Sequence, residues 1–134
     1  MKLINNLIIQ IIPFLPKFFV KIVASPYIAG ISDNEMLNKV QQLNDKGFKV
    51  AIDILGEHVE TENEANEVTN RYISIYNEIS KRNLSANISI KLTHIGQDLG
   101  IDVVRNNLTR LVQAARENNN FLRLDMENTP YTSE

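Results

Sequence analysis

The stretch ANISIKL, residues 86–92, carries the clearest structural signal in this chain, because apolar and polar side chains alternate along it with the period of a β-strand. One face of this strand is apolar and the other is polar. A short, mostly apolar run occurs at residues 50–55, and residues 121–126 alternate again, with Leu122, Leu124 and Met126 opposite Phe121, Arg123 and Asp125. The sequence therefore predicts three strands, at 49–55, 86–92 and 121–126.

Helical patterns precede each predicted strand. Ser32 and Glu35, and again Thr61 and Glu64, predict capping boxes, in which two side chains satisfy free N–H groups at the start of a helix. Apolar residues then recur at helical spacing. We expect helices near 33–46, 62–82 and 102–117.

This alternation of helices and strands implies parallel strands joined by helical crossovers. Each interval between strands has room for one helix and two loops, so the units build either an open doubly wound sheet or a (β/α)8 barrel. Only one glycine follows the first strand, in the segment LGEH at 55–58. The lack of a glycine-rich phosphate loop there disfavours a nucleotide-binding Rossmann sheet.

The composition limits the classes of partner and of chemistry. The 134 residues are 43% hydrophobic and 22% charged, which is typical of one globular domain or part of one. A net charge of −2 gives no electrostatic basis for binding nucleic acid. The sequence has no cysteine, which excludes disulfides, thiolate metal ligands and a cysteine nucleophile.

Residues 1–31 precede the first predicted helix and begin with a mostly apolar stretch. Pro13 and Pro16 interrupt it, and Lys17 and Lys21 add charge, so it lacks the ~20 nearly uninterrupted apolar residues of a membrane span. We expect a helical leader that packs on the rest of the fold or on a partner; a signal or membrane-surface segment is the alternative. The predicted location is the cytoplasm, with at most peripheral contact with a membrane.

Polar side chains stand where each predicted strand ends. They form three pairs along the chain: Asp53 with Glu57, Lys91 with Thr93, and Asp125 with Glu127. Because the carboxyl ends of neighbouring barrel strands lie on one rim, we expect Asp53, Lys91 and Asp125 to converge. A lysine between two carboxylates keeps its charge and suits an anionic substrate group. The same three side chains also suit a salt-bridge network that only stabilises the barrel mouth, and the residues by themselves leave both alternatives open.

The two histidines and two of the tyrosines have simpler interpretations. His58 and His94 lack the spacing of metal ligands, so we expect solvent-facing loop residues and no metal site. Tyr72 and Tyr76 stand four residues apart on a predicted helix and are expected to pack against the core.

The segments around the strand ends resemble the proline dehydrogenase family. They are YIAG at 27–30, DILGE at 53–57, SIKLT at 89–93 followed by Gly96, and DME at 125–127. Each is short, but their order and spacing fit the family throughout, and the likeness covers residues 25–134.

The resemblance implies a distorted (β/α)8 barrel that binds FAD non-covalently and oxidises L-proline to Δ1-pyrroline-5-carboxylate in proline catabolism, with a quinone or another electron acceptor. By motif match, Lys91 corresponds to the lysine that contacts the substrate, Asp125 to the catalytic aspartate, and Met126 to the residue that touches the flavin. Asp53, Glu57 and Thr93 also match family positions, and we expect supporting roles for them.

The chain departs from the family in length, since a complete barrel needs about 250 residues. Residues 32–134 are therefore expected to form the first part of the barrel, about three βα units, and to be inactive alone. The family's arginine-bearing strand, its further phosphate-binding loops and its last helix with paired arginines have no counterpart here, and Asn128 stands where an acidic residue is common. Two other functions stay open: a barrel aldolase or lyase that forms a Schiff base at Lys91, and a non-catalytic barrel remnant with open sheet edges.

Overall fold

The computed structural model describes residues 32–127, and the chain divides into two compact units, Met1–Lys39 and Val40–Glu134. The predicted leader at 1–31 lies outside the described residues. The elements follow in the order α3 (Asp33–Asn44), β1 (Val50–Ile52), α4 (Glu62–Lys81), β2 (Ala86–Ile90), η2 (Thr93–Ile95), η3 (Gln97–Leu99), α5 (Ile101–Glu117) and β3 (Leu122–Leu124). The predicted alternation of helices and strands is confirmed. The strands are shorter than predicted, and the sequence did not indicate the two 3-10 turns.

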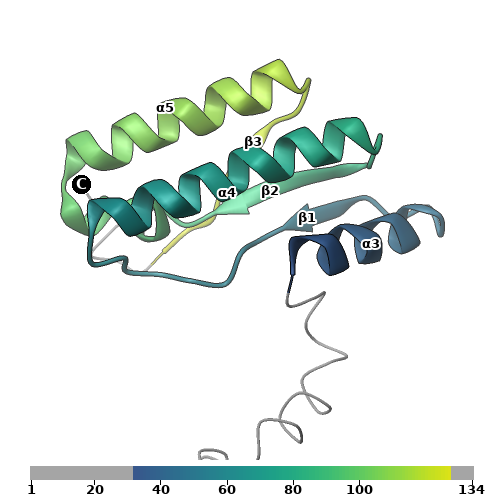
Figure 1. Cartoon of the computed structure of the whole chain (residues 1–134), viewed down its shortest axis with the longest axis horizontal. Coiled ribbons are helices and arrows are strands. Elements are labelled where there is room, and N and C mark those ends of the chain that lie inside the picture. The colour runs from purple at the N-terminus through teal and green to yellow at the C-terminus, as the bar shows by residue number, and fades with distance from the viewer. Residues whose placement is uncertain (1–31, 128–134) are drawn as a thin grey trace, which may run out of the picture. The chain divides into compact units, whose positions relative to one another are not determined.

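The three strands form one parallel sheet in the order β1-β2-β3 (Figure 1). Val50 is in register with Ala86, and Ile88 is in register with Leu122. The prediction of adjacent parallel strands joined by crossovers is therefore confirmed.

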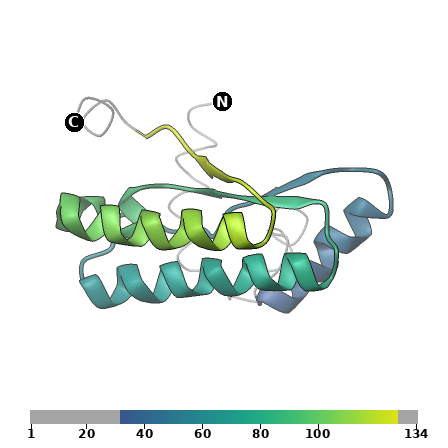
Figure 2. The same ribbon diagram turned by 90° about the horizontal axis from the view of Figure 1, so that it is seen from above.

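Helices α4 and α5 lie side by side over the same face of this sheet (Figures 1 and 2). The face that they cover is apolar, because every second strand residue there is an aliphatic side chain such as Ile52, Ile88 or Ile90, all buried. From the helices, Tyr72, Tyr76 and Leu111 are fully buried against it. Burial of apolar side chains between one sheet face and two amphipathic helices is the main force that stabilises residues 40–127.

The start of α4 shows how local sequence sets an element boundary. Thr61 Oγ1 accepts a hydrogen bond from the backbone N–H of Glu64 at 3.2 Å, and the Glu64 carboxylate accepts one from the backbone N–H of Thr61 at 3.2 Å. The predicted capping box is therefore confirmed at α4. At α3, the backbone N–H of Glu35 donates to Ser32 Oγ at 3.3 Å.

The opposite face of the sheet is polar, and α4 and α5 leave it open (Figure 2). The pairing register places Ser89 and Arg123 on this face, because side chains alternate along each strand. Arg123 is exposed there. No helix within residues 32–127 is long and apolar enough to cross a membrane.

Candidate active site

The three polar strand-end residues lie at one end of the sheet. Asp53 follows β1, Lys91 follows β2 and Asp125 follows β3, where the Asp125 N–H donates to the Ile90 carbonyl at 2.8 Å and so continues the β2–β3 pairing. Asp53 is close enough to interact electrostatically with both Lys91 and Asp125. The structure thus brings the three together at one end of the sheet, as the alternation predicted.

Lys91 pairs with Glu57 and not with Asp53 or Asp125. Its ammonium group donates to Glu57, in the loop between β1 and α4. This hydrogen bond raises the pKa of Lys91 and lowers the pKa of Glu57. Lys91 therefore stays protonated at neutral pH, while 29% of its side chain is still accessible to solvent.

Asp125 is held by a neighbour that the sequence analysis did not single out. The hydroxyl of Ser89, a buried residue of β2, donates to Asp125 Oδ1. Two residues further on, the Glu127 carboxylate accepts hydrogen bonds from the N–H of Thr93, at 3.1 Å, and from its hydroxyl. These contacts attach the exit of β3 to the end of β2 and orient the Asp125 carboxylate. The alternation that assigns Lys91 to the polar face also assigns Ser89 to it, so this signal was present in the sequence.

Asp53 is exposed as a residue, but partial desolvation of its carboxyl group and a second carboxylate nearby oppose its ionisation. Partial loss of water and the charge of Asp125 raise the pKa of Asp53, and Lys91 acts in the opposite direction. The Tyr72 hydroxyl donates to Asp53 Oδ1 at 3.4 Å and accepts from the N–H of Ile54 at 3.2 Å. Tyr72 is fully buried, as predicted, and burial raises its own pKa. A helix residue thus reaches through the core to the end of β1.

Apolar side chains stand exposed around the same strand ends. Met126 is 85% exposed, Leu55 is 82% exposed and Leu124 is 48% exposed. None of the three contributes its full apolar surface to the core of the described residues, so each is available to a ligand or to further protein.

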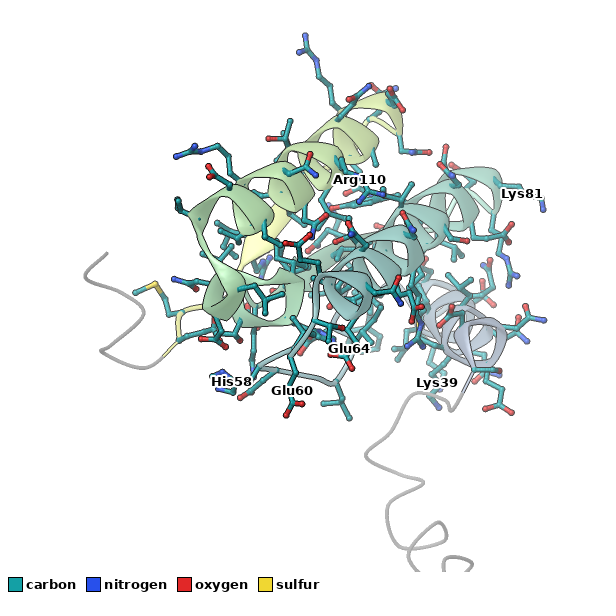
Figure 3. The ribbon with its side chains drawn as sticks, turned by 60° about the vertical axis from the view of Figure 1, so that its left-hand side comes forward. Lys39, His58, Glu60, Glu64, Lys81 and Arg110 are labelled. Atoms are coloured by element: carbon teal, nitrogen blue, oxygen red, sulfur yellow. The ribbon has the colours of Figure 1, made fainter. Side chains whose placement is uncertain are left out.

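The two histidines differ, and the prediction that both face solvent is wrong for His94. His58 is exposed in the β1–α4 loop and points outward (Figure 3). Its Nδ1 lies 2.7 Å from Asp98 Oδ2, and this hydrogen bond raises its pKa. His94 is only 6% exposed, because the turn η2 folds its ring inward, edge-on to Tyr72. Burial lowers the pKa of His94. Across residues 32–127, no three side chains that commonly bind metals are grouped together.

Three curated proline dehydrogenases are similar to this chain over most of its length. Proline dehydrogenase 2 of Bacillus subtilis subsp. natto is 33% identical over 107 residues, which cover 80% of this chain and 35% of that protein. Proline dehydrogenase 1 of Bacillus subtilis is 29% identical over 114 residues, and proline dehydrogenase of Deinococcus radiodurans is 29% identical over 107 residues. The chain thus spans about a third of the length of these relatives.

A solved structure supports the fold. Proline utilization A (PutA) from Bdellovibrio bacteriovorus, inactivated by N-propargylglycine, superposes with a TM-score of 0.64 at 23% identity, over 76% of this chain and 13% of that chain. The parallel strands with helices on one face thus match part of an α/β barrel. The family model described as proline dehydrogenase matches residues 36–133, which include the ends of all three strands. The chain therefore belongs to the proline dehydrogenase family.

Proposed function

We propose that this chain forms the part of a proline dehydrogenase active site that the first three barrel strands carry. The reaction is the oxidation of L-proline to Δ1-pyrroline-5-carboxylate in proline catabolism. The observation that supports it is the group Asp53, Lys91 and Asp125 at one end of the sheet, inside the segment that the family model matches. The names of the relatives point to the same reaction.

The charges of this group complement zwitterionic proline. Lys91 is kept protonated by Glu57 and is partly accessible, so it suits the substrate carboxylate. Asp125, oriented by Ser89, is the carboxylate proposed to face the positively charged ring nitrogen. A cation and an anion on adjacent strand ends would hold the two ends of an amino acid in one orientation.

The exposed apolar side chains near the strand ends suit contact with the ring system of a flavin. Proline dehydrogenases are flavoenzymes, and FAD, when bound, accepts the hydride that leaves the proline ring. Met126 would lie against the flavin ring, because an exposed thioether makes favourable contacts with aromatic systems. Leu124 and Leu55 offer more exposed apolar surface. The electrons would pass on to a quinone or another acceptor, in a cytoplasmic protein with at most peripheral membrane contact.

The test joins residues 1–134 to the carboxyl-terminal part of a complete relative. We expect the chimera to show flavin absorbance and proline-dependent dye reduction. Lys91→Ala should raise the KM for proline about ten- to hundredfold, the usual effect of losing a charged hydrogen bond. Asp125→Ala should mainly lower kcat.

Lys81→Ala is the matched control, because Lys81 is exposed at the far end of α4, where it pairs with Glu78 (Figure 3). It should leave both constants unchanged. An active chimera that is indifferent to both Lys91→Ala and Asp125→Ala would contradict the assignment of these residues.

The alternative of a Schiff-base lyase is disfavoured by the pairing of Lys91. A lysine attacks a carbonyl group as the neutral amine, and the contact with Glu57 raises the pKa of Lys91, which keeps it protonated. Borohydride treatment with carbonyl substrates should therefore leave no covalent adduct on Lys91. An adduct there, found by mass spectrometry, would favour the lyase.

A further inference from the structure

His94 is a buried titratable side chain to which the proposed reaction gives no role. Its ring is edge-on to the ring of Tyr72, with centroids 6.3 Å apart. Its Nδ1 is buried and finds no hydrogen-bond partner among residues 32–127. A polar ring in such a place contributes less to stability than an apolar one of similar size would, so its position calls for an explanation other than core packing.

The Nε2 edge of the His94 ring faces the backbone of Gly56. A Cβ atom at position 56 would lie 2.2 Å from His94 Nε2 and 2.6 Å from Cε1. Real Cβ atoms do not approach other atoms so closely, so only glycine allows the loop between β1 and α4 to rest on this ring. The next residue in that loop is Glu57, the partner of Lys91.

Backbone hydrogen bonds hold in place the turn that carries the ring. The N–H of His94 donates to the carbonyl of Lys91 at 3.1 Å, which ties the turn to the end of β2. The N–H of Val59 donates to the carbonyl of Thr93 at 3.4 Å, which ties the β1–α4 loop to the same turn. The imidazole therefore lies between the segment that carries Glu57 and the segment that carries Lys91.

We propose that His94 is a positioning residue: its buried ring, seated against Gly56, sets the β1–α4 loop so that Glu57 reaches Lys91. The importance of this for proline binding rests on the proposed function, whereas the Glu57–Lys91 pair itself is observed. The charges nearest the ring are those of Asp53, Arg71, Lys91 and Glu57. Burial lowers the pKa of His94, so at neutral pH the ring is uncharged and acts through its shape.

The test is the titration of Glu57 and Lys91 by NMR in the 134-residue chain, with Lys91→Met as the reference for an unpaired Glu57. Gly56→Ala should displace the loop, so the pKa of Glu57 should rise toward its value in Lys91→Met and the pKa of Lys91 should fall. His94→Ala removes the support from the other side and should shift both pKa values in the same directions. In the double variant, the space left by the ring accepts the new methyl group, and the effect of Gly56→Ala should be smaller than in the wild-type background.

Gly100→Ala is the matched control for a general loss of stability. Gly100 also has a positive φ, of 131°, but a Cβ there would meet nothing within 4 Å. It should leave the titrations of Glu57 and Lys91 unchanged. If Gly56→Ala does not fold, His94→Ala decides the question. Unchanged titrations of Glu57 and Lys91 in a folded Gly56→Ala or His94→Ala variant would overturn the proposal. The measurement needs no catalysis, so an inactive chimera would count against the proposed function and not against the positioning role.

Discussion

Tyr72 is predicted from the sequence only to pack against the core, but in the structure its hydroxyl also binds the end of β1. Its hydroxyl bridges Asp53 and the Ile54 N–H, so Tyr72→Phe leaves that N–H without its acceptor and Asp53 without a donor. We expect a loss of about 1 kcal/mol in the free energy of unfolding, measured by urea denaturation. The pKa of Asp53 should rise further, because the lost hydrogen bond stabilised the ionised carboxylate.

Tyr76→Phe provides the comparison for this prediction. Tyr76 is equally buried, and its hydroxyl donates to the carbonyl of Phe121, just before β3, at 3.0 Å. It should cost similar stability and leave the titration of Asp53 unchanged. If both variants shift the titration of Asp53 equally, the Tyr72 hydroxyl has no specific effect on that carboxylate.

The raised pKa of Asp53 predicts how the stability of the fold depends on pH. Its pKa is raised in the folded chain, so the unfolded chain loses this proton at a lower pH than the folded chain does. The ionised carboxylate therefore destabilises the fold as pH rises from the ordinary aspartate pKa, about 3.9, through the raised folded value. Asp53→Asn should be more stable than the wild type at neutral pH, and this advantage should vanish below the ordinary pKa. Thermal melting across this range would measure it, and an advantage that is independent of pH would contradict the explanation.

At the scale of elements, the capping box of α4 stabilises the first turn of that helix. Thr61→Ala removes the oxygen that accepts from the Glu64 N–H, and a lost N-cap costs about 1 kcal/mol. Hydrogen exchange should become faster first in the initial turn of α4. The control is Glu60→Ala, which removes an exposed carboxylate beside the cap (Figure 3). Equal protection in Thr61→Ala and the wild type would show that packing alone fixes this helix end.

The pairing of α4 with α5 depends on a polar contact as well as on apolar burial. Arg110 of α5 lies between the helices (Figure 3) and donates to Asn70 and, at 3.1 Å, to Asn66, both on α4. The same guanidinium donates to Asn107 on its own helix at 3.0 Å. Sequence periodicity predicts which face of each helix is apolar, but it does not show which polar residues of one helix meet those of the other.

At the scale of the whole molecule, we expect the 134-residue chain alone neither to retain FAD nor to oxidise proline. The side chains proposed to meet ligands are open to water, since Lys91 is 29% exposed and Met126 is 85% exposed. Water weakens charged contacts, and the family resemblance assigns the arginines that grip the proline carboxylate to later segments. Gel filtration after incubation with FAD, followed by absorbance and a dye-reduction assay, would check this. Proline-dependent dye reduction by the chain alone would contradict it.

The fold could be predicted well from the sequence because its determinants are local. The period of the apolar side chains along residues 86–92 defines a strand whatever surrounds it. The capping residues mark where α4 begins. The strands were predicted too long, because a strand extends only as far as its neighbour offers hydrogen bonds. The β1–β2 register is observed only up to Ile52 with Ile88.

By itself, the sequence determined the order of the elements, the parallel sheet and the end of the sheet at which Asp53, Lys91 and Asp125 meet, because the carboxyl ends of parallel strands lie at one edge. Only the tertiary structure decided that Lys91 pairs with Glu57 and that Ser89 holds Asp125. It also decided that His94 is buried, because a 3-10 turn directs the ring inward. The physical reason is common to all three: each contact depends on how loops and turns pack around the strand ends, and no periodic pattern in the sequence encodes that packing.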